Sequence, residues 1–305
     1  GSLGTAEEAT RVLFLSKSST FIHSTINRVD GQPSHLDALF ERLAAEHGFE
    51  IESTKDAGRV NAQTLKDFDI VFFYTTGDLT KSGTGDGGIF SGDGEPAMGE
   101  AGLKDLLAWI ADGGGFMGYH CASDTFHGPR DGPVSAYIDM LGGEFLTHGP
   151  KHFFGTVNVI DPTHPTMRSL PKAWNIRDEW YVHKNYNRDA IHVLALFDPG
   201  EEGRTYRVYQ REPYPIAWCR TYGKGRVFYN AMGHREDVWD NPTFQQGFID
   251  ALNWLVDDAP AQADANFNGG KPTLDAKSST SIRKRSPERM ESREGDPDRP
   301  VVAPR

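Results

Sequence analysis

The stretch 113–124, GGGFMGYHCASD, predicts a buried strand that ends in a sharp turn. Three glycines precede an apolar run, which is typical of a helix end followed by a strand. Gly118 stands two residues before His120, the spacing of the strand-to-helix elbow with which several α/β enzymes raise one side chain above a sheet. His120 takes the nucleophile position of this elbow, and Cys121 follows it. The stretch therefore indicates an α/β fold with a reactive group at a strand end.

Strand-like and helical patterns alternate through the first half of the chain. Apolar runs typical of buried parallel strands occupy 11–16, 49–54 and 69–76, and leucines recur at helical spacing within 36–43 and 103–110. This rhythm implies right-handed βαβ units. We therefore expect an α/β fold with a doubly wound, mainly parallel sheet.

The second half of the chain is richer in strands. Strand-like runs separated by turn residues occupy 153–161, 191–197, 215–222 and 225–234. We expect these runs to add strands, partly antiparallel, to the same sheet. The segment 241–258 predicts a closing helix, with Asn241 as N-cap and a proline at the first helical position.

Composition excludes several classes of protein. The formal net charge is −11, whereas binding to a nucleic-acid backbone rests on clustered Lys and Arg, so we expect no nucleic-acid partner. No window approaches the roughly 20 apolar residues of a membrane-spanning helix, so we expect no membrane partner. The two cysteines, Cys121 and Cys219, are too few for a disulfide scaffold.

Composition also divides the chain into three parts. Residues 1–10 form a polar lead-in, 11–258 the folded domain, and 259–305 a polar tail. The opening Gly-Ser is typical of an expression-tag remnant, so a signal peptide could have been removed before it. The tail is too polar to order by itself. We expect it to pack on its own domain or, preferably, on a neighbouring chain in a homo-oligomer.

Polar side chains follow most of the predicted strands. In an open α/β sheet the ligand crevice lies beyond the carboxyl ends of the strands, so these side chains are expected to face one crevice. The expected catalytic set is His120, Asp124, Glu179 and His234, and the expected ligand-binding set is His23, Thr76, Asp78, His148 and Tyr181. The glycine-rich segment 82–98 lacks the lysine of a phosphate-binding loop. We therefore expect a mobile loop over the crevice and no nucleotide.

Several of these residues admit two roles. His120 can act as a general base or as a metal ligand. Asp124 can orient His120 or cap the following helix, and Cys121 is either a small buried residue or a nucleophile. His23, His120, His148 and His234, together with Glu179, could hold a divalent metal ion, and the alternative is ordinary hydrogen-bonding histidines.

An ordered set of motifs resembles the trehalose-utilisation (ThuA-like) family of the class I glutamine-amidotransferase-like superfamily. The motifs are GGGFMGYHCASD, LGGEFLTHGPKH, DPTHPTMRSLP, DEWY and PIAWCRTYGKGRVFYNAMGH, and the resemblance covers roughly residues 11–257. It implies a flavodoxin-like sheet and a bacterial role, in the cytoplasm or the periplasm, in the catabolism of oxidised (3-keto) glycosides. In true glutamine amidotransferases the elbow residue is a cysteine, whereas here it is His120.

These expectations combine into one function and two alternatives. A keto group acidifies the neighbouring C–H, so a base and an oxyanion stabiliser can drive elimination or isomerisation of a 3-keto sugar. His120 is the expected base, and a metal ion or His234 would stabilise the oxyanion. One alternative is a non-catalytic carbohydrate-binding or accessory protein. The other is a cysteine-dependent hydrolase or amidotransferase-like enzyme that uses Cys121.

Overall fold

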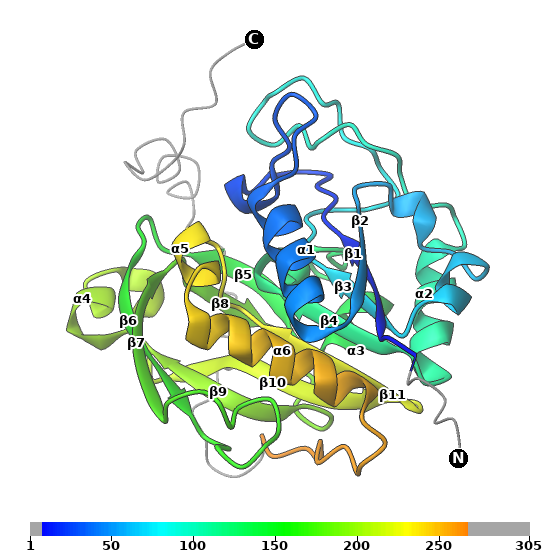
Figure 1. Ribbon diagram of the computed structural model, residues 1–305. Coiled ribbons are helices and arrows are strands. Elements are labelled where there is room, and N and C mark those ends of the chain that lie inside the picture. The colour runs from blue at the N-terminus through cyan, green and yellow to red at the C-terminus, as the bar shows by residue number, and fades with distance from the viewer. Residues whose placement is uncertain (1–7, 268–305) are drawn as a thin grey trace, which may run out of the picture.

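Parallel strands form the centre of a nine-stranded sheet (Figure 1). They are β1 (Arg11–Leu15), β2 (Glu50–Thr54), β3 (Ile70–Phe73), β4 (Gly115–Tyr119) and β11 (Gly225–Asn230). Their order in the sheet is β2-β1-β3-β4-β11, which is the flavodoxin-like doubly wound order. The computed structural model describes residues 8–267, and it confirms the α/β class.

Antiparallel strands extend the sheet beyond β11. They are, in spatial order, β10 (Tyr214–Tyr222), β9 (His192–Asp198), β6 (Phe153–Val159) and β7 (Ala173–Asp178). Each pairs antiparallel with its neighbour, as expected for partly antiparallel additions. The strands β5 (Glu144–His148) and β8 (Tyr181–Lys184) form a separate antiparallel pair. The sequence analysis did not predict β5, β7 and β8, in each of which polar or charged residues interrupt the apolar run.

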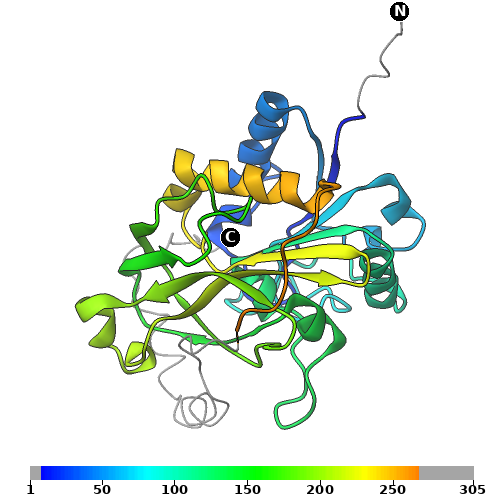
Figure 2. The same cartoon turned by 90° about the horizontal axis from the view of Figure 1, so that it is seen from below.

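Helices cover both faces of the parallel strands (Figure 2). The longer helices are α1 (His35–His47), α2 (Gly102–Ala111), α3 (Ala136–Leu141) and α6 (Pro242–Val256), and the short ones are α4 (Gly200–Arg204) and α5 (Glu236–Trp239). Adjacent residues of β3 show the two layers. The Phe72 ring packs against Phe40 of α1 and Phe248 of α6, whereas the Phe73 ring stacks on Tyr137 of α3. Because side chains alternate along a strand, α1 and α6 share one face and α3 lies on the other.

Side-chain caps fix the starts of the two helices on the α1 and α6 face. Ser34 and Asp37 form a capping box at α1, in which each side chain accepts a hydrogen bond from the other residue's backbone N–H. Asn241 caps α6 by accepting from the N–H of Thr243, and Pro242 follows it. The closing helix predicted from the sequence is therefore confirmed.

The start of the polar tail packs on its own domain. The Asn266 side chain accepts a hydrogen bond from Val193 N at 2.7 Å and Trp254 donates to Ala261 O at 2.9 Å, while Phe267 is buried. The part of the tail that the structure describes thus contacts β9 and α6 of the same chain. The rest of the tail, 268–305, which the sequence analysis expected to pack on a neighbouring chain, lies outside the described residues. Within 8–267, no helix combines the length and the apolar character needed to span a membrane.

Candidate functional site

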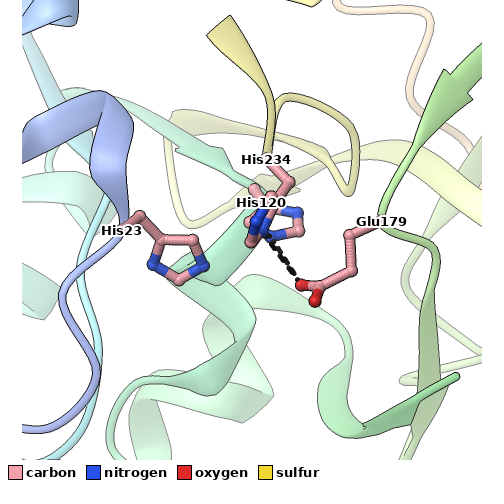
Figure 3. A group of neighbouring side chains, drawn as sticks. All are labelled: His23, His120, Glu179 and His234. Atoms are coloured by element: carbon pink, nitrogen blue, oxygen red, sulfur yellow. Dashed lines mark hydrogen bonds and ion pairs between the residues drawn. The ribbon is translucent and has the colours of Figure 1, made fainter. Parts of the chain in front are cut away.

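Side chains from four separate segments meet beyond the carboxyl ends of the parallel strands (Figure 3). His23 lies in the loop after β1, His120 directly follows β4, and His234 comes shortly after β11. Glu179 directly follows β7 and reaches the same point from the antiparallel half of the sheet. One nitrogen or oxygen atom from each lies within 4.8 Å of the corresponding atom of every other. The crevice predicted from the strand order therefore gathers these four residues.

The elbow after β4 aims His120 at this point. His120 has a φ of 43°, a left-handed conformation that is strained for a residue with a side chain. The hydroxyl of Tyr229 donates to the His120 carbonyl at 2.7 Å and so holds the turn. Gly118 supplies the space, since a Cβ there would lie 3.1 Å from Ala122. Backbone strain retained in this way is typical of a functional position.

Three ligand-type atoms form a small triangle. His120 Nε2 and His234 Nδ1 are 3.1 Å apart, and Glu179 Oε2 lies 3.3 Å from the first and 3.0 Å from the second. Metal–ligand bonds of about 2.1 Å place neighbouring ligands about 3.0 Å apart at right angles and about 3.4 Å apart in a tetrahedron. The triangle therefore has the dimensions of one face of a coordination polyhedron.

The hydrogen bonds around His120 fix its tautomer. His120 Nδ1 faces the carbonyl oxygen of Ala231 at 2.8 Å, and a carbonyl only accepts, so Nδ1 carries the proton. In the neutral ring Nε2 then presents a lone pair to Glu179 and His234. A carboxylate and this lone pair face each other at 3.3 Å, which is unfavourable unless a proton or a cation lies between them.

Glu179 is the electrostatic centre of the cluster. Burial by itself would raise the pKa of Glu179, but the facing His148 and His234 hold it well below its ordinary value. Burial lowers and Glu179 raises the pKa of His234, and the net shift is upward. His148 approaches the other carboxylate oxygen, with Nδ1 3.2 Å from Glu179 Oε1 and 2.7 Å from Gly149 O. Because both neighbours accept, the proton of neutral His148 sits on Nδ1, and His148 orients Glu179 from outside the triangle.

Asp178 joins the two loops that carry Glu179 and His234. Its fully buried carboxylate accepts from Glu179 N at 2.9 Å and from Gly233 N at 2.7 Å. Burial raises its pKa above the ordinary value. The sequence places Asp178 beside Glu179, but it shows nothing of its hydrogen bond to Gly233, and Asp178 was not among the predicted catalytic residues.

Aromatic rings enclose the cluster. Tyr181 packs on His120 with ring centroids 4.1 Å apart, so this predicted ligand-binding residue lies at the site. His23 packs edge-on against both His120 and His234, at 5.0 Å from each. His23 also packs edge-on against the ring of Phe21, with ring centroids 4.9 Å apart. The three histidines of the cluster are thus held in place by packing against other rings.

Asp124 does not take either role predicted for it. The nitrogens of His120 face Ala231, His234 and Glu179, whereas Asp124 Oδ1 pairs with His127 Nε2 at 2.6 Å. Nor does it cap a helix, because α3 begins later and is capped by Ser135. Asp124 therefore belongs to a neighbouring ion pair with His127, three residues further along the chain, a pairing that was not predicted.

The other predicted residues surround the site or lie outside it. Thr76 donates to Phe21 O at 2.8 Å and so fastens the loop that carries His23. Asp78 is 44% exposed and pairs with Lys81 at the rim. Cys121 is fully buried, and burial raises the pKa of its thiol well above the ordinary value. A buried thiol of this kind lacks the thiolate needed of a nucleophile, which argues against the cysteine-hydrolase alternative.

Comparisons with known proteins agree with this architecture. Solved structures of two proteins described as ThuA-like are similar to this chain. The protein from Bacteroides uniformis is 18% identical with a TM-score of 0.60, covering 85% of this chain and 96% of that one. The protein from Parabacteroides merdae is 15% identical with a TM-score of 0.59, covering 85% and 97%. At these identities the likeness shows the fold alone.

The family assignment rests on a separate comparison. No curated protein matches this chain. The family model for trehalose utilisation matches residues 11–255, which contain all four residues of the cluster and all nine strands of the main sheet. A family so described suggests a carbohydrate-related role. The chain belongs to the trehalose-utilisation (ThuA) family.

Proposed function

We propose that this protein is a metal-dependent enzyme of sugar catabolism that acts on a 3-keto glycoside by elimination or isomerisation. The observation that carries the proposal is the triangle of His120, Glu179 and His234, with sides of 3.0 to 3.3 Å. In this arrangement His23 supplies a fourth ligand. The donor set of three imidazoles and one carboxylate favours a divalent transition metal such as Zn²⁺, Mn²⁺, Fe²⁺ or Ni²⁺ over Mg²⁺ or Ca²⁺.

The site offers what proton abstraction beside a carbonyl needs. A bound divalent ion supplies Lewis-acid polarisation of the ketone oxygen. A base removes the C2 proton of the sugar, and the electron pair of that C–H bond forms the enolate. Elimination then expels the C1 oxygen substituent, which takes a proton, whereas isomerisation returns a proton to carbon. Both outcomes balance without an oxidant or a reductant, and both fit a site built from imidazoles.

The metal changes the role that we assign to His120. Its Nε2 lone pair cannot bind an ion and remove a proton at the same time, so His120 is a ligand here. We assign proton abstraction to His148, whose Nδ1 proton is directed at Gly149 and Glu179, which leaves the lone pair of the neutral ring on Nε2. His148 then moves the proton while Glu179, which it contacts, stays ionised.

Turnover of 3-keto glucosides with and without a chelator tests this proposal. We expect the purified protein to convert methyl 3-keto-glucoside, to lose activity on treatment with EDTA, and to regain it with one of the transition metals. His148→Ala should retain the metal and lose turnover, whereas His120→Ala should lose both. Tight binding of the sugar without turnover would instead support the carbohydrate-binding alternative, and turnover that EDTA leaves untouched would remove the metal from the mechanism.

A further inference from the structure

A buried ionic cluster anchors the glycine-rich segment 82–94 to the sheet. Lys17 Nζ lies 2.8 Å from Asp93 Oδ1 and donates to Ser82 O at 2.9 Å, and the side chains of Lys17 and Asp93 are both almost fully buried. Lys55 Nζ lies 3.6 Å from the other oxygen of Asp93 and donates to Ser16 O at 2.8 Å. Ion pairs of this kind cost desolvation free energy, so they are weak evidence for stability alone. We read their role as fixing the position of the segment.

Backbone contacts reinforce this anchor. Gly92 N donates to Thr20 O at 2.8 Å, and Asp93 N donates to Ser18 O at 2.9 Å. Gly92 has a φ of 71°, and a Cβ there would lie 2.7 Å from Ser18 O, so only glycine fits. The mobile loop expected from the sequence is therefore attached at its base to the strand end of β1, and Figure 1 shows it beside the loop that follows β1.

The anchored segment presents an aromatic ring toward the site. Phe90, near its tip, is 45% exposed, and its ring centroid lies 6.4 Å from that of Phe21. Phe21 in turn packs edge-on against His23 of the central cluster at 4.9 Å. A continuous path of rings therefore leads from solvent to the proposed metal centre. The Phe90 ring, which remains 45% exposed at the outer end of this path, is placed to contact a bound ligand.

We propose that Phe21 and Phe90 form an apolar subsite for the leaving group of the glycoside, a step that rests on the proposed function of the neighbouring centre. The reacting sugar contacts the His and Glu cluster, and the group attached at C1 lies against the two rings. Such a surface favours a flat apolar face, either the C–H face of a second pyranose or an aromatic aglycone.

Substrates that differ only in the leaving group test the subsite. The probes are methyl 3-keto-glucoside, 4-nitrophenyl 3-keto-glucoside and a 3-keto disaccharide of glucose. In Phe90→Ala, we expect the preference in kcat/KM for a large leaving group over methyl to fall roughly 2- to 12-fold, the range of one aromatic contact. A fall with the nitrophenyl probe alone assigns an aryl aglycone, and a fall with the disaccharide alone assigns a second sugar. Phe90→Tyr should keep the preference.

The control is Phe154→Ala, which removes a more exposed ring, at 57%, from the β6 strand in the antiparallel half of the sheet. It should leave the preference unchanged. An unchanged preference in Phe90→Ala, or an equal fall in Phe154→Ala, overturns the subsite. If the wild type turns over none of the probes, the proposed function fails. The subsite can then still be tested by calorimetry, from the affinity for each sugar with a large C1 group relative to the methyl glycoside in the wild type and in Phe90→Ala.

Discussion

The backbone N–H of Gly233 donates to the carboxylate of Asp178 at 2.7 Å, and this bond ties the loop of His234 to the loop of Glu179. The other oxygen of Asp178 accepts from the N–H of Glu179 itself at 2.9 Å. One buried carboxylate thus fixes the backbone beside two proposed ligands that are far apart in the sequence. We regard it as a positioning residue, since it acts through Glu179 and His234.

Asp178→Asn should weaken metal binding. An amide can accept from only one of the two N–H groups, and its NH₂ would face the other donor. We expect metal affinity to fall about 10- to 100-fold, the usual effect of losing an outer hydrogen-bond partner. Calorimetric titration with Zn²⁺ measures this. Asp250→Asn changes a buried carboxylate on α6 and should leave the affinity unaltered, so an equal loss in both variants would argue for a general effect on folding.

Gly233→Ala should destabilise the protein and displace His234. Gly233 has a φ of 101°, and an added Cβ would lie 2.8 Å from the indole nitrogen of Trp239. We expect a loss of about 1–3 kcal/mol in the free energy of unfolding, from backbone strain and the clash. Thermal and urea unfolding measure it. At Gly99 the same change meets nothing within 4 Å, so Gly99→Ala serves as the control, and equal stability in the two variants would contradict the geometry.

The ion pairs of His127 should make stability depend on pH. Burial lowers the pKa of His127, but Asp124 and Glu144, each 2.6 Å away, raise it from 6.5 to about 9. Burial raises the pKa of Glu144, but His127 and Asn185 lower it from 4.5 to about 2. The contribution of His127 to the free energy of unfolding is complete below pH 6.5 and is lost as pH rises through about 9. The contribution of Glu144 is complete above pH 4.5 and is lost as pH falls through about 2.

The ion pairs of His127 with Asp124 and Glu144 should therefore stabilise the protein most between pH 4.5 and 6.5. His127→Gln should remove the decline on the alkaline side and also reduce the decline on the acid side, because His127 helps to lower the pKa of Glu144. Urea unfolding at intervals from about pH 2 to about pH 10 measures both limbs. A variant that declines above pH 7 as steeply as the wild type would show that other groups cause the alkaline limb.

Cys121 should be chemically silent in the folded protein. Its burial raises the pKa of the thiol, and the side chain is 0% exposed. We expect iodoacetamide to label it only after unfolding, and Cys121→Ala to retain turnover with a modest loss of stability. Mass spectrometry of the labelled protein follows the reaction. Rapid labelling of the native chain, together with loss of turnover, would restore the cysteine-dependent alternative.

The sequence predicted the centre of the fold and most of the cluster for one physical reason. His23, His120 and His234 follow parallel strands, and the carboxyl ends of parallel strands meet at one edge of the sheet. Glu179 was included in the expected set because it was also taken to follow a strand, but the strand that it follows, β7, is antiparallel.

The contacts that the sequence did not predict depend on tertiary structure. Asp124 and His127 are only three residues apart, but Glu144 of β5, which approaches the other nitrogen of that imidazole, is brought there by the fold. The role of Asp178 runs through a backbone N–H of a loop 55 residues away. Neither a hydrophobic pattern nor a motif encodes such a contact, since it arises only when the strands have paired.

Metal content is the measurement that tests the proposed centre most directly. The protein, incubated with an equimolar mixture of Zn²⁺, Mn²⁺, Fe²⁺, Co²⁺ and Ni²⁺ and then desalted, should retain about one transition-metal ion per chain by elemental analysis. His120→Ala should retain almost none, because it removes the corner shared by the 3.1 Å and 3.3 Å sides of the triangle. His47→Ala, at the exposed end of α1, should retain as much as the wild type. A wild type that retains no metal, or a His120→Ala variant that retains it in full, would contradict the metal centre.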